Sequence, residues 1–267
     1  MLTIFWRTIK DRRNVLIIYV LVSVGVLWMY IGLFPSFKEQ ATNLEQLIKN
    51  YPEGFLKAFN FDIKSFTTIE GFLATEQFSF MWPMLTLFML IGYAGYALTG
   101  EVEKGTIELM LSQPFSRAKL FFAKYLAGLK MFSIYVIFSV LAAVPLCLAY
   151  NVSFHSKNFL TMTVLAFIFG LAVYSIAMFF SSIFSDKGKV FFTSGGILVV
   201  MYILNILASI KDSLSNLKYA SFFYYFNPSK ALVYNQIDHW SYLVFLLTAL
   251  IFTILGVIIF SRRDVTT

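Results

Sequence analysis

The chain has 267 residues, of which 59% are hydrophobic and only 13% are charged, and its mean hydropathy is +0.75. Soluble domains carry about 25% charged residues, so this composition excludes an ordinary soluble protein and indicates an integral membrane protein. The net charge of +7 does not indicate nucleic-acid binding, because the basic residues follow a pattern of membrane topology.

The first 13 residues, MLTIFWRTIKDRR, predict a short amphipathic helix that lies in the membrane interface. Leu2, Phe5, Trp6 and Ile9 recur at helical spacing on one face. Tryptophan favours the depth of the interface, which supports this prediction over the alternative of a frayed tail with a chance stripe.

Six apolar stretches follow that are long enough to cross a bilayer, and none of them contains Asp, Glu, Lys, Arg or His. About 20 residues of helix span the hydrocarbon core, and a helix satisfies its own backbone hydrogen bonds there. The expected spans are residues 15–34, 78–99, 131–150, 159–184, 190–210 and 242–260. Because the sequence shows no repeat and no flexible linker, we expect an all-α integral membrane protein with one domain over residues 1–267.

The lysines and arginines predict the orientation of these spans. With the N-terminus inside, thirteen basic residues fall in the inner segments and eight in the longer outer loops. Cytoplasmic loops carry the excess of basic residues, so both termini are expected in the cytoplasm. The inner face then has a net charge of +7 and the outer face of zero, which suits contact with anionic membrane lipid.

Two outer loops carry more than a simple connection. Residues 35–77 show apolar residues at helical spacing and predict short helices that form a lid, or else a solvated connector. Residues 211–241 contain YASFFYYFNPSKALVY, which predicts a helix dipping into the outer leaflet, or else surface aromatics.

The sequence offers little for catalysis or for self-powered transport. His155 and His239 fall in expected outer loops, and no H-E-x-x-H or G-x-S-x-G motif is present. Carriers driven by protons or sodium usually hold an ionisable residue within a span. Broken helices can bind sodium through backbone carbonyls, and Pro83 and Pro145 lie near span ends, so a self-powered carrier or channel remains the alternative.

The segment between the second and third spans, GEVEKGTIELMLSQPFSR, is acidic on an otherwise basic face. Glu101, Glu103 and Glu108 oppose Lys104, which gives residues 100–113 a local charge of −2. Gly100 and Gly105 have the spacing of the two glycines in a phosphate-binding loop, but Thr106 stands where that loop requires a lysine. The sequence therefore predicts no nucleotide site in this chain.

Local signals predict a short cytoplasmic helix within this segment. Gly105 permits a turn, Thr106 can cap the first amides of a helix, and Glu108 suits the first turn. The helix is expected to end before Pro114, and Ser116 can cap the next helix.

These residues resemble the signature of ABC-2 type transporter permeases, which is roughly E-x-x-x-G-T-[LI]-E-x-L-L-S-x-P-x-S-R with a lysine about two turns later. Lys124 stands at that later position, and Met110 replaces a leucine. The resemblance extends over the chain, and short members with this pattern are similar to the bacitracin-resistance and sodium-efflux permeases. The positions that match are Glu101, Gly105, Thr106, Ile107, Glu108, Leu111, Ser112, Pro114, Ser116 and Arg117.

The resemblance implies a transport subunit and not an enzyme. Such permeases work as homo- or heterodimers in the plasma membrane of bacteria and bind two cytoplasmic ABC ATPase subunits, which hold ATP and magnesium. The segment between spans two and three would be the coupling helix that docks on the ATPase, and spans one, two and five would line the pathway. The residues implied in this coupling are Glu101, Glu103, Gly105, Thr106, Glu108, Pro114 and Arg117.

Overall fold

The computed structural model describes residues 1–39, 67–107 and 116–263. The short helices or lid predicted in the first outer loop fall mostly on residues 40–66, outside the described residues. Most of the predicted coupling helix, including Glu108 and Pro114, falls on residues 108–115 and also lies outside them.

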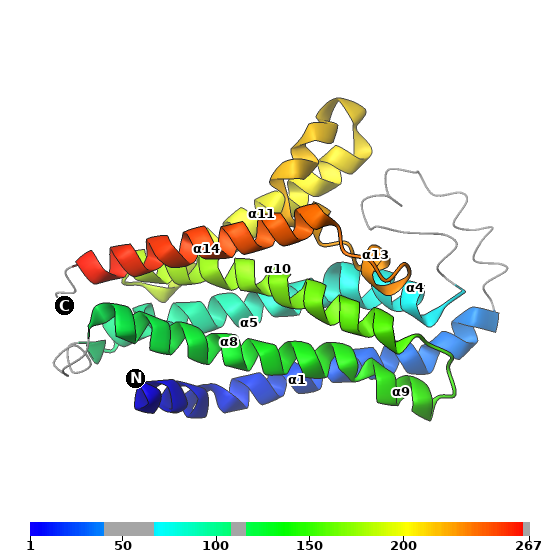
Figure 1. The fold of residues 1–267 in the computed structure, drawn as a ribbon, viewed down its shortest axis with the longest axis horizontal. Helices are drawn as coiled ribbons and strands as arrows, with labels where there is room; N and C mark the ends of the chain where they lie inside the picture. Colours follow the sequence, from blue (N-terminus) through cyan, green and yellow to red (C-terminus); the bar gives the residue numbers. More distant parts are fainter. Residues whose placement is uncertain (40–66, 108–115, 264–267) are drawn as a thin grey trace.

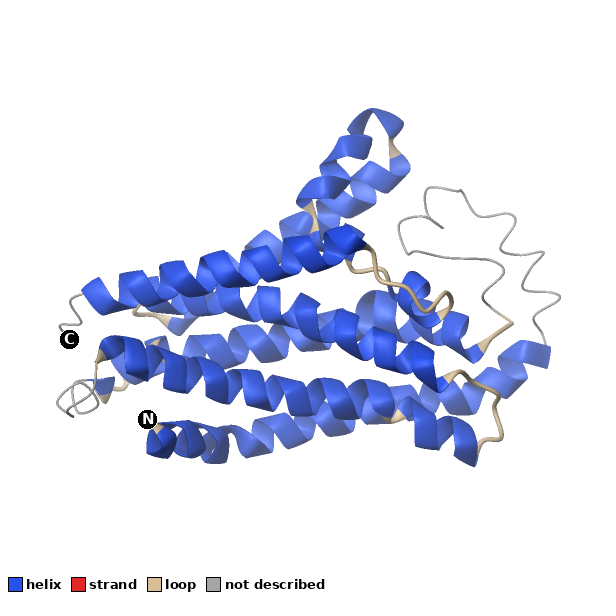
Figure 2. Cartoon of the chain, viewed as in Figure 1, coloured by secondary structure: helices blue, strands red, loops and turns tan. Residues whose placement is uncertain are grey.

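The described part of the chain contains six apolar helices long enough to cross a membrane, several shorter helices and no strand (Figure 2). The all-helical class and the number of spans predicted from the sequence are therefore confirmed. The first three spans are α1 (Leu2–Glu39), α4–η2–α5 (Ile69–Leu73, Ala74–Met81, Trp82–Ala97) and α8–α9 (Arg117–Leu141, Ala143–Ala149). The last three are α10 (Ser156–Ile183), α11 (Lys187–Ile210) and α14 (His239–Arg262).

Helix α10 is the centre of the bundle. Two thirds of the residues in its apolar stretch are buried (67%), against 22% in α1, α11 and α14. It packs against α5, α8, α11 and α14, whose outer faces keep apolar side chains exposed (Figure 1). A helix that is apolar all round suits this central position, and exposed apolar faces suit contact with lipid.

Two glycines set the close contact between α8 and α10. A Cβ atom at Gly128 would lie 2.1 Å from the Tyr174 hydroxyl, and one at Gly170 would lie 2.0 Å from the Phe132 ring. Each ring occupies the space that a side chain would fill. Small residues permit this close packing between membrane helices.

The helix boundaries correct two sequence predictions. Residues 1–13 do not form a helix of their own, because α1 runs without a break from Leu2 to Glu39. Lys130 on α8 lies over the rings of Trp6 and Phe5, at 4.3 and 5.7 Å, which places this first part of α1 against the bundle. The second span begins at Ile69 and not at residue 78, with a π-helical stretch over Ala74–Met81.

A buried acid explains the early start of the second span. The Glu70 carboxylate is 5% exposed, accepts a hydrogen bond from the His155 backbone amide at 2.7 Å, and lies 3.1 Å from its Nδ1. The His155 side chain itself is 82% exposed, as expected for a loop histidine. The contact ties the start of α4 to the loop before α10.

The last outer loop folds back onto the bundle. It forms η3 (Asp212–Ala220), α12 (Phe222–Tyr225) and α13 (Pro228–Leu232). Phe222, Phe223 and Phe226 are buried, and the Phe226 ring lies 4.5 Å from that of Phe169 on α10. These three aromatics belong to the core, whereas Tyr219 and Tyr224 are exposed, so the loop holds both buried and surface aromatics. The helix predicted to dip into the outer leaflet stays a prediction. The outer part of α11 leans away from the bundle with η3 beside it (Figure 1).

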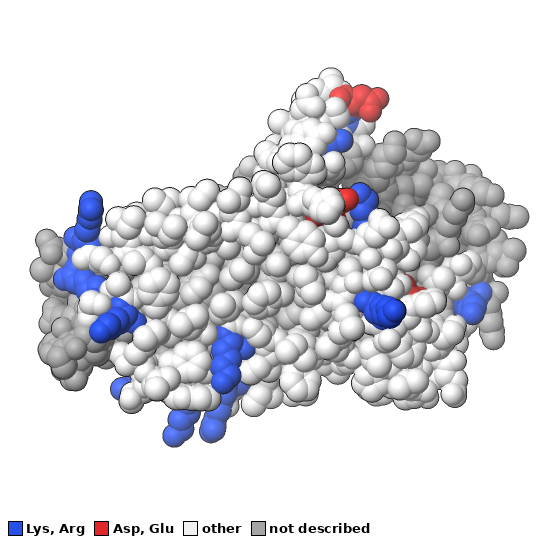
Figure 3. Space-filling model, in the orientation of Figure 1, with Lys and Arg blue, Asp and Glu red and all other residues white. Residues whose placement is uncertain are grey.

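Both termini lie at one end of the bundle, together with the start of α8 (Figure 1). Basic side chains gather toward this end, whereas the middle of the molecule is nearly free of charge on the face drawn in Figure 3. This arrangement fits an even number of spans. Its assignment to the cytoplasmic side remains a prediction from the positive-inside pattern.

Candidate functional site

The candidate site begins where α5 ends and the chain turns toward α8. This is the end of the bundle at which α1 begins and α14 ends, and it is called the inner end below. Helix α6 (Thr99–Glu103) follows α5 after Leu98, and Gly105 then adopts a φ of +65°. Only glycine adopts this left-handed conformation without strain. The turn predicted at Gly105 is confirmed.

Glu101 is held by two partners at this turn. Lys124 on α8 donates a hydrogen bond to its carboxylate at 2.6 Å, and the Thr106 hydroxyl donates a second. The side chains of Lys124 and Glu101 are only 6% and 19% exposed. Burial raises the pKa of Glu101, but the charge and hydrogen bond of Lys124 outweigh burial and hold the pKa below its ordinary value. The pair therefore consists of two charged groups.

Glu103 makes a matching contact with α11. Its carboxylate lies 2.6 Å from the Lys187 ammonium and also accepts a hydrogen bond from the Lys187 backbone amide. These hydrogen bonds from Lys187 lower the pKa of Glu103. Two neighbouring acids of α6 thus connect the turn to two different spans.

A third set of contacts joins the inner ends of the remaining helices. The Thr99 hydroxyl bonds to Ser181 and to the carbonyl of Phe184 at the end of α10. Arg263, just after α14, donates to the same Phe184 carbonyl at 3.0 Å, and Arg117 donates to the carbonyl of Arg263. The start of α8 is therefore linked to the ends of α10 and α14.

The structure places five of the predicted coupling residues at this end, and two fall outside the described residues. Glu101, Glu103, Gly105, Thr106 and Arg117 all lie there. The amides that Thr106 was predicted to cap belong to residues 108–115, outside the described residues. The Ser116 cap is confirmed, because its hydroxyl accepts from the Lys119 amide at 3.3 Å.

Sequence reasoning missed several partners. Lys187, Thr99 and Arg263 carry no local signal, since each meets its partner across about 80 residues or more of chain. Lys124 was the exception, because its place in the resemblance pattern singled it out.

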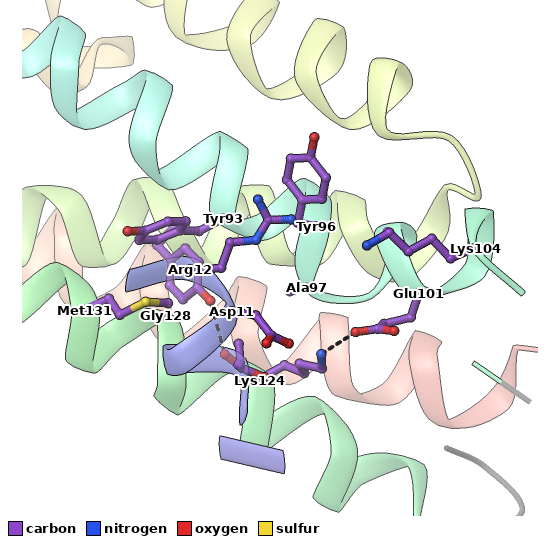
Figure 4. A pocket seen from close by; sticks show the side chains of 13 residues that line it. Asp11, Arg12, Tyr93, Tyr96, Ala97, Glu101, Lys104, Lys124, Gly128 and Met131 are labelled. Carbon is purple, nitrogen blue, oxygen red and sulfur yellow. Dashed lines mark hydrogen bonds and ion pairs between the residues drawn. The ribbon is translucent and has the colours of Figure 1, made fainter. Parts of the chain in front are cut away.

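Two cavities lie beside these contacts. The first, the inner cleft, has a volume of about 70 Å³. It is lined by Thr8, Asp11, Arg12, Tyr93, Tyr96, Ala97, Gly100, Glu101, Lys104, Lys124, Gly128, Met131 and Tyr174 (Figure 4). The second, the membrane groove, has a volume of about 330 Å³ and is formed by α1, α5 and α11. Its lining residues are Arg12, Val15, Tyr19, Phe88, Met89, Gly92, Tyr93, Tyr96 and Phe191.

The described residues contain no group of three or more His, Cys, Asp or Glu side chains that could hold a metal ion. This end of the bundle has ion pairs that connect α6 to α8 and α11, and two cavities that differ in polarity. Six helices that are long and apolar enough to cross a membrane define the class of multi-pass membrane proteins.

Comparison with protein families identifies the particular family. The model of the ABC-2 family transporter protein matches residues 2–265, and the chain belongs to this family. The protein is therefore an ABC-2 type permease, a membrane transport subunit of the ABC transporter class. No curated protein matches the chain.

Proposed function

We propose that this permease is the membrane subunit of an ATP-driven exporter, that it acts as a dimer, and that separate cytoplasmic ABC ATPase subunits supply the energy. ATP and magnesium would bind to those partner subunits. The observation that carries the proposal is that two ion pairs, Glu101–Lys124 and Glu103–Lys187, fix the turn after α5 to α8 and α11.

These ion pairs suit the transmission of force. A loosely attached loop would absorb a displacement of the neighbouring coupling segment. A turn fixed to three spans would instead pass the displacement to α5, α8 and α11 together, as in a rigid-body rocking motion. Closure of an ATPase dimer beneath the membrane would supply that displacement.

The predicted coupling residues then divide into two roles. Glu101, Glu103, Thr106 and Arg117 hold the turn and the start of α8 within the chain. Gly105 provides the turn. Glu108 and Pro114, outside the described residues, belong to the segment proposed to dock on the ATPase.

The membrane groove is the proposed part of the transport pathway. It is formed by the first, second and fifth spans, which are the spans that the family resemblance implies for the pathway. A second copy or a paralogue would lie beside this subunit in the same bacterial membrane and would face the groove. Exposed apolar side chains on α1 and α11 give that second subunit a surface to contact.

Co-purification tests the proposal against a self-powered carrier or channel. The tagged permease is co-expressed with a candidate ABC ATPase from the same organism and is isolated from detergent-solubilised membranes. The proposal expects the ATPase to remain bound and expects the Glu108→Lys variant to lose most of it while still inserting into the membrane. A permease that transports without any bound ATPase would support the alternative.

A further inference from the structure

The inner cleft and the membrane groove meet at three residues. Arg12, Tyr93 and Tyr96 line both cavities. The inner cleft is lined mainly by polar and charged groups, and the groove mainly by apolar and aromatic ones. One elongated ligand could therefore occupy both.

The inner cleft offers positive charge for such a ligand. The Arg12 guanidinium lies 3.5 Å from the centre of the Tyr96 ring, and Figure 4 shows the Lys104 ammonium directed toward the same space. Lys124 is neutralised by Glu101, whereas no ion pair within the described part of the chain involves Arg12 or Lys104. Asp11 also lines the cleft, with its carboxylate between Arg12 and Lys124 in the view of Figure 4, and approaches Arg7 at 3.9 Å.

Tyr93 adds an unused hydrogen-bond donor. Its side chain is 5% exposed, and its hydroxyl is buried without a partner among the described residues. Buried hydroxyl groups without partners are rare and unfavourable in folded proteins. Figure 4 shows this hydroxyl directed away from Arg12 and Lys104, so it is open to a polar atom along the body of an elongated ligand and not to the group that these two cations bind.

The membrane groove offers an apolar surface next to these groups. Val15, Phe88, Met89 and Phe191 line it, and Gly92 leaves room beside the Phe191 ring, which a Cβ atom would contact at 3.6 Å. An alkyl or aromatic body in this groove would bury apolar surface.

We propose that the inner cleft and the membrane groove together bind an amphipathic anion. Its anionic group lies between Arg12 and Lys104, and its apolar body lies along Phe88, Met89 and Phe191. The inference deepens the proposed function, on which it rests for the role of the groove in transport. A phosphate-bearing lipid and an exported amphiphile share this chemistry.

Photolabelling of the full-length permease tests the site directly. The permease is placed in phosphatidylcholine nanodiscs and labelled with dodecyl phosphate that carries a diazirine near the end of its chain, and the modified peptides are identified by mass spectrometry. Labels on α1, α5 and α11 that are displaced by unlabelled dodecyl phosphate are expected. Dodecanol at the same concentration should compete at least about tenfold less well, since hydrogen bonds to charged groups are among the stronger ones.

Matched variants separate the two ends of the site. Arg12→Gln should reduce the labelling about tenfold, whereas Arg13→Gln, on the same helix turn but outside both cavities, should not. Gly92→Leu fills the groove and should abolish labelling there. Gly196→Leu, which has no neighbouring atom within 4 Å, is its control.

The outcomes decide both the ligand and the proposal. Competition by phosphatidylglycerol would identify a membrane lipid as the occupant, and its failure to compete would indicate another amphipathic anion. Equal competition by dodecanol or equal loss in the two arginine variants would overturn the proposal. Because the assay contains no ATPase, loss of labelling with intact ATPase binding refutes this inference alone, and the reverse result refutes the proposed function alone.

Discussion

Removing the carboxylate of Glu101 should destabilise the inner end of the bundle and uncouple it from an ATPase. The substitution Glu101→Gln leaves the Lys124 ammonium, which is 6% exposed, without its ionic partner. Breaking a fully buried pair in this way costs about 3–5 kcal/mol. Because the Glu101 side chain is 19% exposed, we expect about 2–3 kcal/mol, since water solvates part of the remaining charge.

The assay is unfolding of the purified permease in nanodiscs, followed by ATP turnover of its complex with the ATPase. The double variant Glu101→Gln, Lys124→Met removes both charges and should recover about half or more of the lost stability, since removing both partners of a buried pair leaves no unpaired charge. The control is Asp11→Asn, which breaks an exposed pair with Arg7 at 3.9 Å and should change the stability by about 0–1 kcal/mol.

Equal effects of Glu101→Gln and Asp11→Asn would refute this reasoning. So would a double variant that is less stable than Glu101→Gln alone. A stable Glu101→Gln permease with unchanged coupling would show that the turn after α5 transmits nothing.

Three further predictions concern the same molecule. Gly170→Ala should lower stability by about 1–3 kcal/mol in the same unfolding assay, because its Cβ would lie 2.0 Å from the Phe132 ring, whereas Gly196→Ala should change little. Gly105→Ala should cost about 1–2 kcal/mol because of its φ of +65°, and ATPase-coupling measurements should show a larger defect than membrane insertion does. The pKa values of Glu101 and Glu103 are lowered in the folded protein, so both carboxylates stabilise it fully above their unfolded pKa of about 4.3. This stabilisation is lost as the pH falls through the lower folded pKa values. Unfolding measured from pH 6 to 3 should show the loss of stability, and the loss should be smaller in Glu101→Gln.

The sequence predicted the features that depend on local composition. Six uncharged apolar stretches gave the number of spans, and Gly105 and Ser116 gave a turn and a helix cap that the structure confirms. Each of these follows from a residue and its near neighbours, so no knowledge of the tertiary structure was needed.

Features that depend on distant partners were missed. The second span was predicted over residues 78–99, which contain no charged residue, yet the helix begins at Ile69 and buries Glu70 against the His155 amide. The separate N-terminal helix was wrong for a similar reason. An amphipathic stripe over residues 1–13 suggested a separate interfacial helix, but these residues belong to a helix that continues to Glu39 and packs beside α8.

The candidate site shows the same division. The family pattern singled out Glu101 and Lys124 but did not predict that they contact each other. Glu103 was interpreted as part of an acidic surface. The structure instead pairs both acids with lysines of other spans. Because Glu101 and Glu103 are paired within the chain, the negative charge that residues 100–113 can offer to a partner depends more on Glu108, which lies outside the described residues.

The central claim is that the segment between α6 and α8 docks on an ABC ATPase. Its most direct test is a photo-crosslinking residue, p-benzoylphenylalanine, placed at position 108 of the permease in cells that also produce a candidate ABC ATPase from the same organism. Position 157, at the opposite end of the bundle, is the control. The account predicts a cross-link from position 108 to the ATPase and none from position 157. A cross-link from position 108 only to lipid, or to an extracytoplasmic protein, would contradict it.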